Sequence, residues 1–241
     1  YGLGGHDTLI GNAKPGARLY GGDGHDVLDD DDQPDGPGGK LYGEGGHDIL
    51  IGRAGDDLLD GGQDNDFIEG GTGNDVLLGD RANDTAGGND WLAGGEDLDL
   101  LDGGANGDAL FGGAGADILF GGTGDDRMYG DTDFRNIYLA RYAGAIAVLG
   151  SDDPNFSGTF AMTKDVALAE AGDDYLDGGP GSDELFGGAG DDILIGDAGD
   201  EAPGADVLQG EGGDDQLFGG RGNDILWGDS DPATVVQDGQ I

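Results

Sequence analysis

The segment 70–78 reads GGTGNDVLL, and the same nine-residue frame recurs along most of the chain. The frame is Gly-Gly-x-Gly-x-Asp-x-U-x, where x is variable and U is a large aliphatic residue. Two residues after each frame aspartate stands Leu, except at Ile68 and Met128. A disordered acidic chain has no reason to keep an aliphatic residue at a fixed distance from each aspartate, so the pattern predicts a repeating fold. The sixth position is occupied by Asp7, Asp26, Asp48, Asp57, Asp66, Asp75, Asp90, Asp99, Asp108, Asp117, Asp126, Asp174, Asp183, Asp192, Asp206, Asp215 and Asp224.

Each unit divides into a turn and a short strand. The glycine-rich part is predicted to turn, because glycine accepts positive φ angles and close backbone approach. The residues that follow are apolar and partly β-branched in units such as 75–78 and 192–195, which favours a strand. Since side chains alternate across a strand, U faces one side and its neighbours face the other. The uniform U position predicts the interior, and the mixed neighbours predict a solvent-facing surface.

Two units form one coil of 18 residues, and successive coils are expected to stack as parallel strands. The number of units predicts an all-β parallel roll of about eight or nine coils, roughly 40 Å long. Its core would be a ladder of Leu side chains, about one per half-coil. One buried aliphatic side chain does not offset the entropy of ordering nine residues, so the roll needs a further source of stability.

Composition indicates what that source is and excludes several functions. The 241 residues include 57 Gly, and 52 Asp or Glu against 10 Lys or Arg, giving a formal net charge of -42. So much like charge favours either disorder or a fold that binds cations. Nucleic acid is excluded as a direct ligand, because phosphate binding requires basic residues. No apolar run approaches the ~20 residues that span a bilayer, so no direct membrane insertion is expected. The absence of Cys excludes disulfides and thiolate chemistry.

The sequence resembles the RTX family of calcium-binding nonapeptide repeat proteins. Seven units match the family motif at every defined position, namely 21–29, 70–78, 112–120, 121–129, 178–186, 187–195 and 219–227. The resemblance implies a parallel β-roll with calcium ions between successive turns. It also implies secretion through a type I channel and folding on arrival in calcium-rich medium.

Calcium chemistry supports the same assignment. Calcium takes about six to eight oxygen ligands, from carboxylates and backbone carbonyls together. Aspartates 18 residues apart, such as Asp57 and Asp75, should stack and repel each other unless a cation lies between them. Magnesium prefers strict octahedral geometry and retains its waters, and zinc prefers His or Cys. We therefore predict calcium, on the order of ten or more ions, as the ligand.

The predicted ligands are of two kinds. The carboxylates are those of the frame aspartates named above. The backbone carbonyls are those of Gly22, Gly24, Gly55, Gly71, Gly73, Gly113, Gly115, Gly122, Gly124, Gly179, Gly181, Gly188, Gly190, Gly213, Gly220 and Gly222.

The frame breaks at several places. One early unit carries Ala17 at the sixth position, so a weak or empty site is expected there. The segment 30–40 is acidic, contains proline and is predicted to be a surface loop. The sequence leaves open whether a further group of aspartates, each following a glycine at a break, adds calcium ligands or caps turns. These are Asp80, Asp131, Asp197 and Asp229.

The longest break, 132–168, holds enough apolar residues to fold against the roll or to dock a surface or protein partner. The expected organisation is a first repeat block at 1–131, the apolar insertion at 132–168 and a second repeat block at 169–229. A C-terminal cap or linker is expected at 230–241. Because the repeat is already running at Gly2, the chain is expected to be a piece of a longer protein.

No group of residues supports an active site or a cofactor site other than calcium. His6, His25 and His47 all stand at the fifth frame position, where a polar turn residue is expected. Paired acids such as Asp56 and Asp57 combine one predicted metal ligand with a solvated neighbour.

Aromatic residues at the ninth position form a pattern of their own. Phe111 and Tyr129 are 18 residues apart and should stack on one outer face, with Phe120 on the opposite face. Such a row either binds a partner or covers the sheet beneath the insertions.

The predicted function is non-enzymatic: a calcium-binding, calcium-folded structural module of a secreted protein. It would lie outside the cell or at the cell surface, with calcium ions and the remainder of the parent chain as partners. Two alternatives are an adhesive or surface-layer segment that binds a partner through its outer face or insertion, and the accessory domain of a secreted hydrolase or epimerase.

Overall fold

The computed structural model describes residues 1–11, 16–30, 38–80, 87–130, 172–197 and 204–228, together with the backbone of 235–238. The predicted insertion at 132–168, Asp131 and Asp229 lie outside these residues. The described residues form strands and turns and contain no helix.

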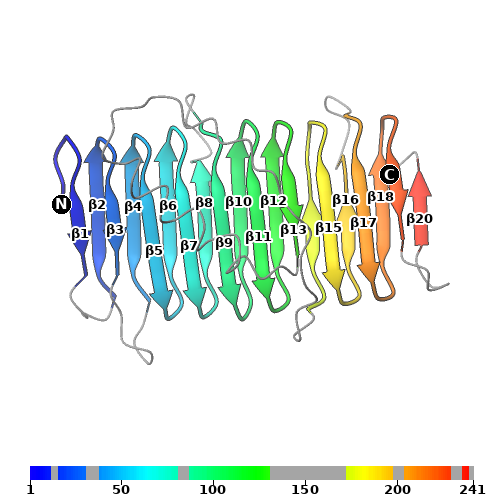
Figure 1. Ribbon diagram of the computed structural model, residues 1–241, viewed down its shortest axis with the longest axis horizontal. Coiled ribbons are helices and arrows are strands. Elements are labelled where there is room, and N and C mark those ends of the chain that lie inside the picture. Colours follow the sequence, from blue (N-terminus) through cyan, green and yellow to red (C-terminus); the bar gives the residue numbers. More distant parts are fainter. Residues whose placement is uncertain are drawn as a thin grey trace, which may run out of the picture.

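Twenty short strands follow one another along the described part of the chain (Figure 1). They are β1 (Thr8–Ile10), β2 (Arg18–Asp23), β3 (Val27–Asp29), β4 (Lys40–Gly45), β5 (Ile49–Ala54), β6 (Leu58–Gln63), β7 (Phe67–Thr72), β8 (Val76–Asp80), β9 (Trp91–Glu96), β10 (Leu100–Ala105), β11 (Ala109–Ala114), β12 (Ile118–Thr123), β13 (Arg127–Tyr129), β14 (Tyr175–Asp177), β15 (Glu184–Ala189), β16 (Ile193–Ile195), β17 (Val207–Gly212), β18 (Gln216–Gly220), β19 (Ile225–Trp227) and β20 (Val235–Asp238).

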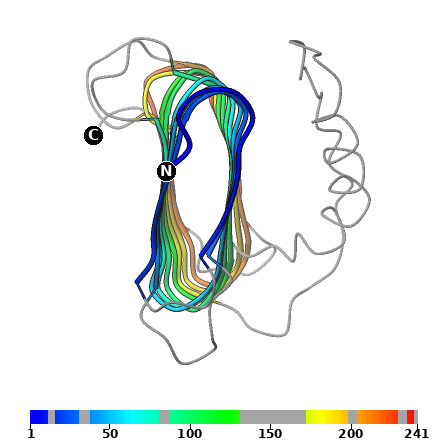
Figure 2. The same cartoon turned by 90° about the vertical axis from the view of Figure 1, so that its left-hand side faces the viewer.

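Alternate strands belong to two different parallel sheets. The even sheet holds β2 to β20 and the odd sheet holds β1 to β19, and each strand pairs with the strand two further along the chain. The chain therefore passes through one sheet and then the other in every coil (Figure 1). Viewed along the stack, the two sheets face each other as the long walls of a narrow roll (Figure 2). The parallel β-roll predicted from the repeat is confirmed.

Strand pairing continues across the long insertion. β12 pairs with β14 and places Leu119 opposite Leu176, and β13 pairs with β15 and places Met128 opposite Leu185. The two repeat blocks therefore share both sheets.

The U residues form the interior of the roll. In β12, Leu119 is completely buried between Ile118 and Phe120, which are each 36% exposed. This alternation is the one expected of a strand with one interior face. The ladder is partly buried at Leu9, Leu19 and Leu226 near the two ends. Its completely buried members are Leu28, Leu41, Leu50, Leu59, Ile68, Leu77, Leu92, Leu101, Leu110, Leu119, Met128, Leu176, Leu185, Leu194, Leu208 and Leu217.

Each sheet has ten described strands, more than the eight or nine coils expected from the aspartates. Two additional strands come from units that lack an aspartate at position six. β2 follows Ala17 and β4 follows Gly39, yet both place a leucine in the core ladder, Leu19 and Leu41 respectively. Backbone pairing and the leucine ladder therefore continue where the frame aspartate is missing.

The prediction of a surface loop at 30–40 is wrong at both ends of that segment. Lys40 begins β4, and Asp30 is completely buried. The segment resembles a loop in sequence because it is acidic and contains proline. Its two ends belong to a repeat unit that departs from the frame at position one, Asp30, and at position six, Gly39.

Positions two and four of the frame adopt left-handed backbone. Gly71 at position two has φ 123° and Gly73 at position four has φ 119°, which glycine accepts without steric strain. The described non-glycine residues with positive φ all stand at these same two positions. They are Glu44, Arg53, Asp64, Asp97, Asn106 and Glu211.

Candidate metal centre

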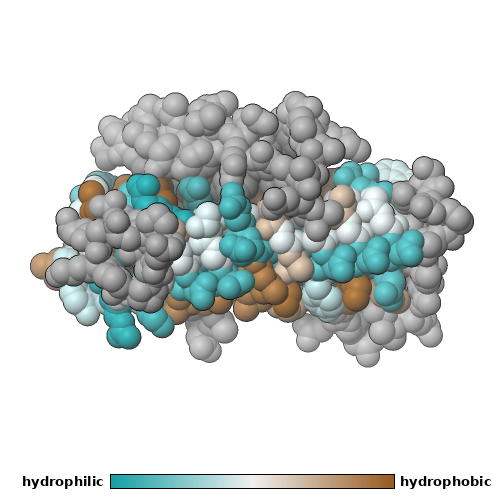
Figure 3. Space-filling view, turned by 90° about the horizontal axis from the view of Figure 1, so that it is seen from below, coloured by the Kyte–Doolittle hydropathy of each residue, from teal (hydrophilic) through white to brown (hydrophobic). Residues whose placement is uncertain are grey.

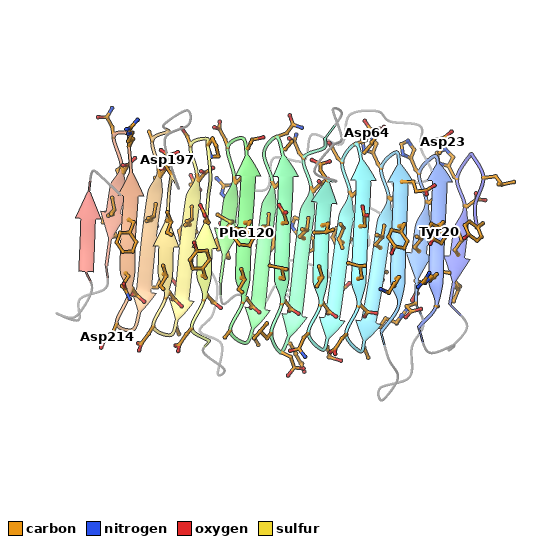
Figure 4. The ribbon with its side chains drawn as sticks, turned by 180° about the vertical axis from the view of Figure 1, so that it is seen from behind. Tyr20, Asp23, Asp64, Phe120, Asp197 and Asp214 are labelled. Atoms are coloured by element: carbon orange, nitrogen blue, oxygen red, sulfur yellow. The ribbon has the colours of Figure 1, made fainter. Side chains whose placement is uncertain are left out.

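The frame aspartates lie in two rows, one along each edge of the roll. Figure 4 labels other aspartates of these turns, with Asp64 and Asp197 at one edge and Asp214 at the opposite edge. The first row, in turns that lead from the even to the odd sheet, contains Asp7, Asp26, Asp48, Asp66, Asp90, Asp108, Asp126, Asp183, Asp206 and Asp224. The second row, in turns that lead from the odd to the even sheet, contains Asp57, Asp75, Asp99, Asp117, Asp174, Asp192 and Asp215.

Hydrogen bonds connect successive aspartates in each row. Within each row, the backbone N–H of every aspartate before the last donates to Oδ1 of the aspartate in the next coil, with N to Oδ1 distances of 2.7 to 3.2 Å. The series crosses the long insertion, where the Asp117 N–H donates to Asp174 at 2.7 Å. Asp57 and Asp75 are thus stacked, as the 18-residue repeat predicts.

The second carboxylate oxygen, Oδ2, is buried without a hydrogen-bond donor in eleven aspartates of the described chain. A buried anionic oxygen without a partner is costly, and native proteins usually satisfy such atoms. These oxygens therefore indicate that the turns take up a positively charged ligand. The eleven belong to Asp26, Asp48, Asp66, Asp75, Asp90, Asp99, Asp108, Asp126, Asp183, Asp206 and Asp224.

Burial changes the acidity of these carboxyl groups. It raises the pKa of Asp48, Asp90 and Asp99 to about 8, and that of Asp108 to about 10. The main cause at each of the four is loss of hydration, while the hydrogen bond to the preceding coil lowers the pKa in part. At neutral pH such a group binds a proton or a cation in preference to remaining a bare anion.

The first glycine of each unit leaves room for the carboxylate. A Cβ atom on Gly70 would lie within 3.0 Å of both Asp75 Oδ2 and the carbonyl oxygen of Gly94 in the next coil. Real Cβ atoms do not approach other atoms so closely, so the missing side chain allows the two oxygens to converge. The same close approach is present at Gly21, Gly43, Gly52, Gly79, Gly94, Gly103, Gly112, Gly121, Gly130, Gly187 and Gly196.

These first glycines are absent from the ligand set predicted from sequence. The available signal was the near-constant glycine at frame position one, which a positive φ angle does not explain. At Gly70 the backbone φ is not positive, so the requirement there is for space and not for a special conformation.

The glycines predicted as carbonyl ligands face the gaps between coils. A Cβ on Gly73 would meet the carbonyl oxygen of Gly55 in the preceding coil, and one on Gly213 would meet that of Gly190. Carbonyl oxygens at positions two and four therefore line the space between stacked turns.

The donor set suits calcium. Among the described residues, no three Asp, Glu, His or Cys side chains form one cluster. Each regular turn contributes the buried carboxylate of its frame aspartate, and the turns at Asp80 and Asp197 contain a second buried carboxylate. Backbone carbonyls are further oxygen donors. A set made of oxygen atoms alone fits calcium and does not fit zinc.

The model of the RTX calcium-binding nonapeptide repeat matches residues 18–33, 40–68, 52–86, 84–119, 102–134, 168–200 and 202–234. The chain belongs to the RTX calcium-binding nonapeptide repeat family. The RTX roll is therefore a structural calcium-binding repeat module, of a kind typical of secreted proteins. Comparison with curated proteins finds no match. No described helix is long and apolar enough to cross a bilayer.

Asp80 and Asp197, the two described aspartates at the breaks, accept backbone hydrogen bonds. Asp80 accepts hydrogen bonds from the backbone N–H groups of Gly88 at 3.1 Å and Ala105 at 3.0 Å. Asp197 accepts one from Gly204 at 3.0 Å. Both carboxylates join the two ends of an insertion, which favours the turn-capping role.

The three histidines stack at the edge of the roll, with neighbouring ring centroids 4.9 Å apart. Nδ1 of His25 accepts a hydrogen bond from the backbone N–H of His47 at 2.7 Å, and Nδ1 of His47 accepts one from Asn65 at 2.9 Å. Their contacts are those of turn residues.

The outer aromatic row lies on the odd sheet. Phe111 and Tyr129 stack with ring centroids 5.2 Å apart, and Trp91 packs on the other side of Phe111. Phe111 is completely buried and Trp91 is 5% exposed, so this part of the row is covered. Viewed from below, the described surface is mostly hydrophilic, with hydrophobic residues gathered near the middle of the roll (Figure 3).

We expect Gly70→Ala to destabilise the calcium-loaded roll by about 1–3 kcal/mol, because the added methyl group would be forced against Asp75 Oδ2 and the Gly94 carbonyl. The matched control is Gly45→Ala, since no heavy atom lies within 4 Å of a Cβ built on Gly45. Urea unfolding in saturating calcium measures both. Equal stability of the two variants would contradict the close packing at the first glycine.

Proposed function

We propose that this RTX roll is a calcium-triggered folding module of a secreted protein. The observation that carries the proposal is the set of buried Oδ2 atoms that the described protein leaves without a donor. Calcium ions between successive turns would bind these oxygens, together with the carbonyl oxygens at positions two and four. Each aspartate would then bridge two ions.

The acidic composition supports a role in export. A chain with a net charge of -42 repels itself and stays extended where calcium is scarce. Extracellular calcium modules bind with a Kd of about 10⁻⁴–10⁻³ M. Because calcium binds the folded state, each site adds RT ln(1 + [L]/Kd) to the free energy of unfolding. The chain would therefore pass through a type I channel unfolded and fold into the β-roll outside the cell.

Calcium-dependent folding also suggests what the roll does within the parent protein. The roll would serve as a rigid spacer or carrier that folds only where calcium is present. The covered state of Trp91 and Phe111 disfavours the adhesive alternative in which the outer aromatic row binds a partner.

A calcium titration followed by far-UV circular dichroism tests the proposal. We expect a cooperative change from a disordered to a β spectrum between about 10⁻⁴ and 10⁻³ M calcium. Magnesium at the same concentrations is the control and should produce no such change. A chain with the same β spectrum in chelator and in calcium would overturn the proposal.

A further inference from the structure

We propose that Asp30 is a calcium ligand that supplies, from the first position of its unit, the carboxylate that is missing from the sixth. This extends the second row of calcium sites by one turn beyond Asp57. The inference rests on the proposed function and concerns a residue that departs from the family motif, which has glycine at this position.

The unit that leads into β4 exchanges two residues of the frame. Asp30 directly follows β3 and stands at position one, where the other units of the row have glycine. Gly39 directly precedes β4 and stands at position six, where they have aspartate. Compared with the regular frame, aspartate and glycine have changed places at the two ends of segment 30–39.

Backbone hydrogen bonds establish these positions independently of the sequence. The Asp30 N–H donates to the Ile51 carbonyl at 3.0 Å, just as the first-position Gly130 N–H donates to Phe186 at 2.8 Å. The Gly39 N–H donates to Oδ1 of Asp57, which is the bond that each frame aspartate makes to the next coil. Both residues therefore occupy regular places in the stack.

The carboxylate of Asp30 enters the turn from the opposite side. A Cβ atom on Gly39 would lie within 3.0 Å of Asp30 Oδ2, as one on Gly70 would lie within 3.0 Å of Asp75 Oδ2. In both units a glycine without a side chain makes room for a carboxylate from the other end of the segment that joins two strands, which is 70–75 in the regular unit and 30–39 here. Asp30 is 0% exposed, so its carboxylate lies inside the turn, as those of the regular aspartates do.

The same carboxylate also faces the preceding coil. A Cβ on Gly11 would lie within 3.0 Å of Asp30 Oδ1, so this oxygen lies beside the adjacent turn, where Ala17 provides no carboxyl group. The Arg53 guanidinium pairs with the neighbouring Asp29, at 2.5 and 2.6 Å. A buried anion at this place suits a divalent cation bound between the coils.

The test uses native mass spectrometry of the whole chain at matched free calcium. Asp30→Gly should bind one calcium ion fewer than the wild type and require a higher calcium concentration to fold. The double variant Asp30→Gly/Gly39→Asp places glycine at position one and aspartate at position six, as in the regular units, and should recover the lost ion. Asp23→Asn is the control for charge, since Asp23 is exposed at the end of β2 (Figure 4).

The outcomes separate this inference from the proposed function. If Asp30→Gly retains the wild-type number of ions, or if the double variant does not recover the ion, Asp30 is a packing residue and the inference is wrong. If the wild type itself binds no calcium, the proposed function fails.

Discussion

With calcium chelated at pH 7.5, the chain is expected to lose its β structure, and acidification to about pH 4 is expected to restore it. In the folded roll, burial raises the pKa of Asp48, Asp90 and Asp99 to about 8 and that of Asp75 to about 7. In the unfolded chain these groups return to an ordinary pKa near 3.8. The folded state therefore binds more protons than the unfolded state between these values.

The difference in bound protons determines how the stability of the metal-free roll changes with pH. Proton binding stabilises the metal-free roll fully below the unfolded pKa, and this stabilisation is lost as pH rises through about 7 to 8. Acid also reduces the repulsion among the 52 acidic residues, which acts in the same direction. Most proteins behave in the opposite way and lose stability in acid.

Circular dichroism in chelator between about pH 3.5 and 8 measures this dependence. In calcium the trend should reverse, because protons and calcium compete for the same oxygens and apparent calcium affinity should rise towards pH 8. A metal-free chain that is folded at neutral pH and unfolds in acid would contradict the burial of these carboxyl groups.

The second large effect is expected from Asp99→Asn. Asp99 is completely buried, its Oδ1 accepts the Asp75 N–H at 2.9 Å, and its Oδ2 has no donor within the described protein. In calcium, removing this charge should cost about 3–5 kcal/mol, because a bound cation loses its anionic ligand inside the roll. In chelator, Asp99→Asn should instead stabilise the roll. The variant should stay folded to a higher pH than the wild type, because one fewer buried carboxyl group must remain protonated.

Asp97→Asn is the matched control in the same turn. It removes the same charge two residues away, from an exposed position with φ 82° that asparagine also accepts. Urea unfolding in calcium and the pH midpoint in chelator should both stay close to the wild type. Equal effects of the two variants would mean that net charge, and not ligation inside the turn, stabilises the roll.

The proposed role of Asp30 could not be inferred from the residues next to it in the sequence, because it depends on contacts between coils. Composition alone places this residue in an acidic loop, and its role becomes visible once β4 is seen to begin at Lys40 and Gly39 is seen to fill position six. A motif read along the chain does not detect a carboxylate delivered from the other end of a turn. The space that it fills is defined by two different coils.

The amino-acid sequence by itself determined the repeat length, the buried leucine ladder, the two rows of aspartates and the preference for calcium. Each of these follows from a regular spacing and from residue chemistry, which need no knowledge of distant contacts. The tertiary structure alone decided the roles of Gly70 and its equivalents, the strand that follows Gly39, and the hydrogen bonds of Asp80. These depend on how closely one coil approaches the next, and that distance is set by contacts between residues 18 or more positions apart.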